Sequence, residues 1–144
     1  MKRIARSAIV QRSAETLYAL VEDIESYPEF LPWCRAATVR ERSPGRTVAT
    51  LKVGVKGLQH SFTTENVNTP GRAIDLRLVE GPFRHFAAAW RFTALGPEAA
   101  KIEFSLEYEF AGKAIAAALG PLFGGIADSM VEAFTRRAAS PRDG

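Results

Sequence analysis

Between Cys34 and Phe110, apolar and polar side chains alternate with a period of two, and this pattern constrains the fold more than any other feature. It is clearest in KIEFSLEYEF, where Ile102, Phe104 and Leu106 alternate with charged or small polar residues. Successive side chains of a strand point to opposite faces, so the pattern predicts strands with one dry and one solvated face. Such strands are typical of an antiparallel meander, because parallel sheets are usually buried on both faces.

Turn-forming sequences divide this region into about six strands. Reversals are predicted at Gly57, within NTPGR, within EGPF and within LGPEA, because glycine, proline and asparagine dominate tight turns. The N-terminal MKRIARSAIVQR is basic, as in presequences and signal peptides, but its apolar run is too short for either. The alternation there favours a seventh strand, and we expect a mature cytoplasmic protein.

Two helical regions flank the predicted strands. Ser13 is the expected N-cap of the first helix, which must end before Pro28. The second covers Lys113–Ala139, where Pro121 and three glycines are expected to weaken or kink the middle. Its first half, Ala114–Phe123, is almost entirely apolar; we expect core, with a lid or membrane-touching element as the alternative. Its predicted buried stripe is Ile115, Leu119, Leu122, Ile126, Met130 and Ala133.

This order of elements predicts an α+β fold, in which a curved antiparallel sheet of about seven strands wraps around a long C-terminal helix. Short helices follow the first strand. A chain of 144 residues is sufficient for one domain, predicted over residues 1–139, with residues 140–144 as a frayed tail. The apolar space between sheet and helix is the expected small-molecule site.

The sequence offers no recognisable catalytic or metal-binding constellation. His60 and His85 have no further ligands at metal-binding spacing, and a single cysteine excludes a disulfide or a cysteine cluster. The strand glutamates, such as Glu107, lie on the predicted wet face, where solvated charges are more common than general acids or bases. We therefore expect no metal, no covalent cofactor and no enzymatic activity.

A net charge of +3 permits an anionic partner without requiring one. A solvated basic face is the expected role of the dispersed cations, and phosphate contact with a structured RNA is the alternative. DNA is not an expected partner, and aromatics for base stacking are not interleaved with the cations. The cations considered are Lys2, Arg3, Arg6, Arg12, Arg35, Arg40, Arg42 and Arg46.

Three segments, LVEDIESYPEFLPWC, KIEFSLEYEF and LGPLFGGIADSMVEAFTRRA, resemble the coenzyme Q-binding, polyketide cyclase/dehydrase-like branch of the START superfamily. The resemblance implies a START-like helix-grip fold and non-catalytic binding of a ubiquinone-type isoprenoid, by a carrier or chaperone that supports respiration. Bacterial relatives in this branch include a ribosome association toxin that hinders the joining of ribosomal subunits. A ribosome-directed inhibitor is therefore the alternative, and a polyketide cyclase or dehydratase is a weaker one.

Under the leading hypothesis the ligand is ubiquinone or another isoprenoid lipid, and the protein is a bacterial one that transiently contacts the inner-membrane surface. Candidate partners for the quinone head are Tyr27, His60, Trp90 and Tyr108. Tyr27, Phe30 and Trp33 are expected to close or gate one end of the cavity. The full predicted lining is Tyr27, Phe30, Trp33, Leu51, Val53, His60, Phe62, Leu76, Leu78, Phe86, Trp90, Phe104, Leu106, Tyr108, Leu122, Ile126 and Met130.

Overall fold

The computed structural model describes residues 1–55 and 57–139, and these have the predicted α+β architecture. The predicted tail, residues 140–144, lies outside the described residues. The helices are α1 (Ala14–Glu22), the 3-10 helix η1 (Ile24–Glu29) and α2 (Lys113–Ala139). The strands are β1 (Lys2–Val10), β2 (Cys34–Ser43), β3 (Arg46–Val55), β4 (Leu58–Thr69), β5 (Ala73–Glu80), β6 (Phe83–Gly96) and β7 (Ala99–Phe110).

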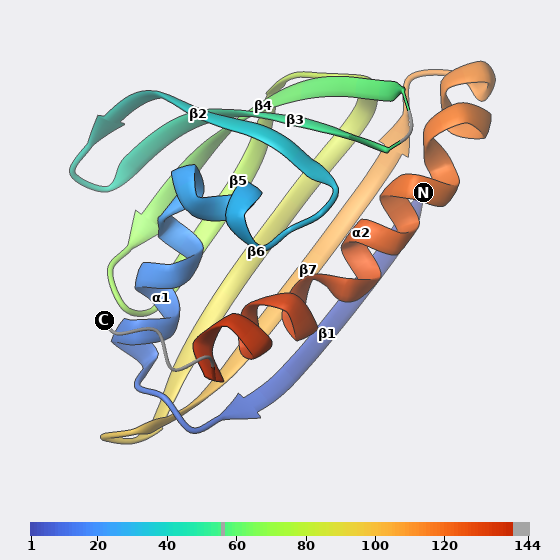
Figure 1. The fold of residues 1–144 in the computed structure, drawn as a ribbon. Helices are drawn as coiled ribbons and strands as arrows, with labels where there is room; N and C mark the ends of the chain where they lie inside the picture. The colour runs from blue at the N-terminus through green and yellow to red at the C-terminus, as the bar shows by residue number, and fades with distance from the viewer. Residues whose placement is uncertain (56, 140–144) are drawn as a thin grey trace.

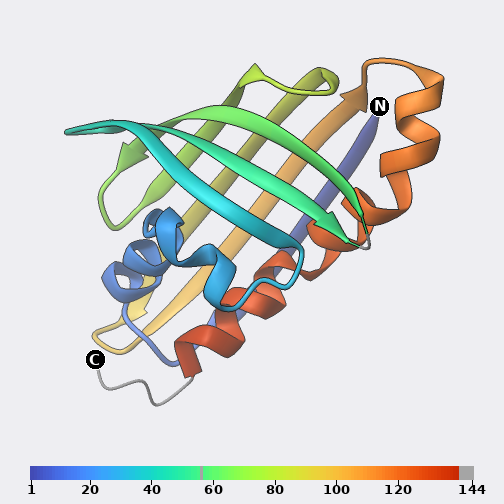
Figure 2. The same cartoon turned by 45° about the horizontal axis from the view of Figure 1, so that its top comes forward.

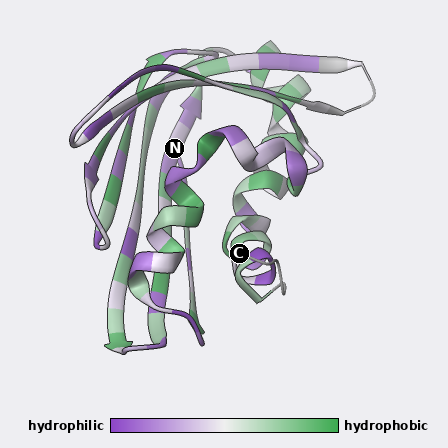
Figure 3. Cartoon of the chain, turned by 60° about the vertical axis from the view of Figure 1, so that its left-hand side comes forward, coloured by the Kyte–Doolittle hydropathy of each residue, from purple (hydrophilic) through white to green (hydrophobic). Residues whose placement is uncertain are grey.

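All seven strands form one antiparallel sheet in the order β1-β7-β6-β5-β4-β3-β2. The first strand therefore pairs with the last, with Lys2 opposite Tyr108 and Val10 opposite Ala100. The sheet curves around the helices, and α2 runs along the β1–β7 side (Figure 1). Seen from another direction, α1 and α2 both lie inside the curve (Figure 3). The predicted helix-grip fold is confirmed.

The chain turns where its turn residues predict. Gly57 and Gly71 have φ values of 85° and 74°, a left-handed conformation that glycine adopts without steric cost. At the start of α1, the Ser13 hydroxyl accepts a hydrogen bond from the Thr16 amide at 3.1 Å. The α-helix ends at Glu22, and Pro28 is accommodated in the short 3-10 helix that follows.

The predicted register of β7 is confirmed, because Ile102, Phe104, Leu106 and Tyr108 are all buried on the inner face. They form part of one hydrophobic core that also takes in α1, η1 and the second half of α2. The amphipathic pattern of β7 is therefore what fixes this part of the sheet against the helices.

The inner face of β3 and β4 contains polar side chains that the alternation pattern does not predict. Thr47, Thr64 and Asn66 are buried, whereas Val67 is 52% exposed. The Thr64 hydroxyl donates to the Asn66 side-chain carbonyl at 2.8 Å, and the Asn68 amide donates to the Thr47 hydroxyl at 3.0 Å. These polar groups tolerate burial because they bond to one another.

The C-terminal helix is continuous from Lys113 to Ala139, and its axis bends between the orange first turns and the red remainder (Figure 2). Its buried stripe differs from the predicted one, since four predicted members, Ile115, Leu122, Met130 and Ala133, are only half-buried. The buried positions are Leu119, Phe123, Ile126, Ala127, Val131, Phe134 and Ala138. Leu122 and Phe123, and Met130 and Val131, are adjacent apolar pairs, so apolar spacing alone could not fix the rotation of the helix about its axis.

Candidate functional site

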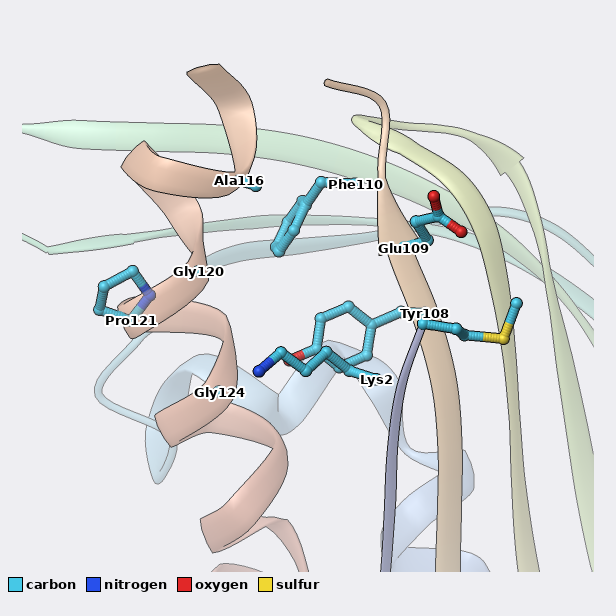
Figure 4. A pocket seen from close by; sticks show the side chains of 9 residues that line it. Lys2, Tyr108, Glu109, Phe110, Ala116, Gly120, Pro121 and Gly124 are labelled. Carbon is cyan, nitrogen blue, oxygen red and sulfur yellow. The ribbon is translucent and has the colours of Figure 1, made fainter. Parts of the chain in front are cut away.

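A cleft of about 700 Å³ opens between the first half of α2 and the neighbouring ends of β1 and β7 (Figure 4). Its walls are mostly apolar, and strand and helix contribute side chains from opposite sides. The lining residues are Met1, Lys2, Tyr108, Glu109, Phe110, Ala116, Gly120, Pro121 and Gly124. The volume falls in the range of small-molecule sites, so this cleft is the candidate ligand-binding site.

Small residues on α2 keep the cleft open. A Cβ atom added at Gly120 or Gly124 would meet nothing within 4 Å, apart from the local helix backbone. Any larger side chain at these positions would project into free space, because both glycines line the cleft. The glycines that we expected to weaken the helix therefore also define the shape of the site.

Tyr108 and Lys2 supply most of the polar chemistry inside the cleft. The Tyr108 ring points from β7 towards α2, and the Lys2 side chain extends beside it (Figure 4). Burial raises the pKa of the Tyr108 hydroxyl, which therefore remains a hydrogen-bond donor at neutral pH. A ligand with an apolar body and one or two acceptor oxygens would satisfy this combination of groups.

Aromatic rings fill the space on the inner side of Tyr108. Phe123 of α2 lies at the centre, with ring centroids 4.8 Å from Tyr108, 5.0 Å from Phe83 and 6.3 Å from Phe62. Phe86 lies 6.4 Å from Phe123 in the same cluster. Phe62 and Phe86 were predicted to line a cavity, and that prediction is wrong, because their rings pack into the core instead. The alternation of apolar and polar residues identifies the inward face of a strand. It does not show whether the inward rings contact one another and fill the space between sheet and helix.

Two of the proposed head-group partners have structural roles. The Tyr27 hydroxyl donates a hydrogen bond to the Val21 carbonyl, and its ring lies 5.4 Å from that of Phe134. Trp90 is only 2% exposed and packs against Phe104, with centroids 4.6 Å apart. Neither side chain lines the cleft, and half-buried His60 does not line it either. Of the four candidates, only Tyr108 lines the cleft.

The predicted gate residues meet the other half of α2. A second pocket, of about 400 Å³, lies between residues 30–33 and residues 129–137, and both Phe30 and Trp33 line it. The Arg137 guanidinium lies 4.6 Å from the centre of the Phe30 ring and pairs with Glu29 at 2.8 Å. The loop is therefore attached to α2 beside this second pocket. It was predicted to gate the ligand cavity, but none of its three aromatic residues lines the larger cleft.

The other predicted lining residues pack in the hydrophobic core or against it, and none lines the cleft. They are Leu51, Val53, Leu76, Leu78, Phe104, Leu106, Leu122, Ile126 and Met130. The polar or small residues of the cleft were missed because they do not fit an apolar pattern. Gly120 and Gly124 were a usable signal, since repeated glycines within a helix leave space beside it.

The structure gives the acidic and thiol side chains ordinary structural roles. Glu107 lies 3.9 Å from Arg3, and Glu109 pairs with Arg84 at 2.9 Å. Burial raises the pKa of the Cys34 thiol to about 11, so the reactive thiolate is scarce at neutral pH. Within residues 1–55 and 57–139, no three His, Cys, Asp or Glu side chains could together hold a metal ion.

The first turns of α2 are more exposed than predicted. Ala114, Ala117, Ala118 and Pro121 are exposed, so the expectation that the whole of Ala114–Phe123 is core is wrong. These turns project beyond the main body of the sheet (Figure 2). By length and composition alone, α2 is the one helix of the described chain that meets the requirements of a membrane span.

The cations that we considered as a solvated basic face do not form one surface. Arg6 pairs with Asp128, and Arg42 lies 3.4 Å from Glu22. Arg3 and Arg46 also have carboxylate partners. Arg12 donates to the Ala138 carbonyl at 2.9 Å. Most of these cations therefore stabilise contacts within the chain, so the number of arginines alone says little about a partner.

Comparisons with known proteins agree with the fold. Residues 10–135 match the family described as polyketide cyclase/dehydrase and lipid transport. The ribosome association toxin RatA of Vibrio cholerae is 46% identical over 138 residues, covering 96% of each chain. RatA of Escherichia coli K12 is 44% identical and is covered over 87% of its length. A mitochondrial coenzyme Q-binding protein COQ10 homolog B of Xenopus laevis is 27% identical, with 95% of this chain and 59% of that protein covered.

Solved structures share the same architecture. The ZhuI aromatase/cyclase of Streptomyces superposes with a TM-score of 0.82 at 18% identity, covering 95% of this chain and 93% of that one. A START superfamily protein of Mycobacterium smegmatis gives a TM-score of 0.75 at 22% identity, covering 94% and 95%. At these identities the likeness concerns the fold alone.

Proposed function

The chain belongs to the polyketide cyclase/dehydrase and lipid transport family, and within it we propose that the protein is a ribosome-directed inhibitor that hinders the joining of ribosomal subunits. One observation carries this proposal: relatives that share almost half of the sequence over nearly its whole length are named ribosome association toxins. The coenzyme Q-binding name belongs to a more distant relative. The sequence motifs favoured quinone binding over a ribosome-directed role, and we now propose the ribosome-directed role first.

The proposed inhibition needs no chemical step. A compact protein bound to the joining face of one subunit prevents contact with the other by occupying the space. The net charge of +3 is compatible with association with a particle rich in phosphate, whose contacts with cations supply much of the affinity of such complexes. We accordingly propose a binding protein, rather than an enzyme, that acts where ribosomes are found.

Sucrose-gradient profiles test this function directly. Purified protein is added to separated ribosomal subunits under conditions in which they normally join, and the same profile is recorded from cells that overproduce it. We expect free subunits to accumulate at the expense of joined ribosomes. Leu106→Glu is the control, because a charge at this buried position should prevent folding. Unchanged profiles with well-folded wild-type protein would show that the proposal is wrong.

The cleft supports a second candidate function, the binding of a ubiquinone-type isoprenoid or a similar lipid. Its lining is mostly apolar, and each methylene group removed from water contributes about 0.8 kcal/mol. Tyr108 and Lys2 could donate hydrogen bonds to the oxygens of a quinone head. The exposed apolar turns of α2 form one wall, which would suit the entry of a lipid from a membrane surface.

Organic extraction of the protein purified from its native host, followed by mass spectrometry, tests the lipid hypothesis. Co-purified quinone or another isoprenoid is the expected result. Tyr108→Phe retains the ring and removes the hydroxyl, so it should weaken binding of a quinone more than binding of a plain hydrocarbon chain. If no lipid is extracted and added quinone does not bind, the cleft has another purpose.

A further inference from the structure

The outer face of the sheet has two electrostatically different halves. Over β5, β6, β7 and β1 the arginines are neutralised by nearby carboxylates. Arg91 pairs with Asp75 at 2.8 Å, and Arg84 pairs with Glu109 at 2.9 Å. Positive and negative charges alternate there, so this half presents little net charge to a partner.

The half formed by β2 and β3 is different. Arg35, Arg40 and Lys52 are exposed, and none of them forms an ion pair with any residue of the described chain. Glu41, on the same strand as Arg40, pairs instead with Arg46 at 2.8 Å. Three positive charges without counter-charges therefore lie on two neighbouring strands.

The strands set the backbone positions of these three residues, and one hydrogen bond orients Arg40. The Arg40 guanidinium donates to the Thr50 hydroxyl at 3.1 Å, and Thr50 in turn lies 2.7 Å from the Thr63 hydroxyl. Lys52 follows Thr50 by two residues and therefore lies on the same face, about 7 Å further along β3. Arg35 and Arg40 both occur at irregularities of β2, next to the free edge of the sheet.

We infer that this surface, defined by Arg35, Arg40 and Lys52 with the hydroxyls of Thr38, Thr50 and Ser61, binds the phosphate backbone of RNA. The inference rests on the proposed function and gives it a contact surface. Cations and hydroxyl groups are the side chains that most often contact phosphate, and a partner with regularly spaced negative charges complements them.

The composition of the surface favours backbone over base recognition. The exposed large apolar residues of the described chain are Met1, Ile9, Val67, Val79 and Leu95, none of them aromatic, so no ring is available there for stacking on bases. Thr38, Thr50 and Thr63 lie opposite one another across β2, β3 and β4, and Glu80 of β5 lies opposite Thr63. Glu80 forms no ion pair within the described chain, so its negative charge marks the limit of the surface. Contacts of this kind hold a structured RNA without reading its sequence.

Replacing two of the cations tests the inference. Arg40→Gln with Lys52→Gln should lower the slope of log affinity against log salt by about 1.4–1.8, and should weaken binding to ribosomal subunits about ten- to twentyfold at 200 mM salt. The matched control, Arg84→Gln with Arg91→Gln, removes the same charge from the neutralised half and should change binding less than threefold. Circular dichroism verifies that both variants fold.

Measurements on intact subunits and on protein-free ribosomal RNA separate the possible results. Equal losses in the two double variants would overturn the inference, because net charge alone would then explain binding. A loss confined to intact subunits would also overturn it, and would point to an acidic ribosomal protein as the contact. If wild type binds free RNA through Arg40 and Lys52 but binds no subunit, the surface is right and the proposed function is wrong. If it binds neither, both fail.

Discussion

Filling the cleft from the helix side should make the protein more stable while it impairs ligand binding. Gly124→Leu is the chosen change, because a Cβ atom at Gly124 meets nothing within 4 Å outside the local helix backbone. Leucine is a strong helix former, so the substitution should raise the free energy of unfolding by about 0.8 kcal/mol. For a chain of this size, that gain raises the Tm by about 2–3 °C.

The same substitution removes space from the site. The leucine side chain would displace about three methylene groups of a bound lipid, which at about 0.8 kcal/mol each amounts to about 2.4 kcal/mol. The affinity should therefore fall roughly fiftyfold. Urea denaturation measures the stability, and equilibrium dialysis with a short-chain ubiquinone measures the binding.

Gly125→Leu is the matched control for both measurements. Gly125 is the next residue of α2, is exposed, and does not line the cleft, although a Cβ atom there also meets nothing within 4 Å. It should gain similar stability and retain full affinity. Equal affinity in the two variants would refute the assignment of the cleft as a lipid site, and a large loss of stability in Gly124→Leu would refute the described packing of α2.

Four further substitutions test the register of β7 and the packing of the core. Leu106→Glu should unfold the protein or abolish ligand binding, whereas Glu107→Leu should do neither, and a similar loss in both by circular dichroism and dialysis would contradict the register of β7. Phe134→Ala, at a fully buried position, should lower the free energy of unfolding by about 3–5 kcal/mol in urea titrations, and a loss under 1 kcal/mol would contradict that packing. Burial raises the pKa of Cys34 to about 11, so the folded state holds this proton more tightly than the unfolded chain does. The free energy of unfolding should therefore fall between about pH 9 and 11. Cys34→Ala should remove part of that fall. Identical profiles of unfolding free energy against pH for the wild type and the variant would contradict the assigned role of Cys34.

Most of the fold follows from features that act over a few residues. The two-residue period of β7, the turn at Gly71 and the N-cap at Ser13 each specify local geometry, and their combination leaves few alternatives to a curved meander around a helix. The sequence was less informative about which face of α2 is buried. Leu122 and Phe123 are both apolar, and only the aromatic partners on the sheet decide that Phe123 is the buried one.

The site was harder to predict because glycine and polar residues form much of its lining, and the apolar alternation pattern does not select such residues. A search for inward apolar side chains selects residues such as Phe62 and Phe86, which meet other rings and close the interior. The open space lies instead beside Gly120 and Gly124, and its polar groups come from opposite ends of the chain. The pairing state of each arginine likewise depends on neighbours in other strands, which single-sequence reasoning cannot identify.

The pairing of β1 with β7 has a consequence for how the protein is made. Lys2 pairs with Tyr108, more than one hundred residues later, so β1 cannot join the sheet until β7 has been synthesised. At translation rates of about 5–20 residues per second, this delay lasts roughly 5–20 seconds. Until then the growing chain has neither the complete sheet nor the cleft, because β1 and β7 contribute to both. The activity proposed on ribosomes would therefore not be available before β7 has been synthesised.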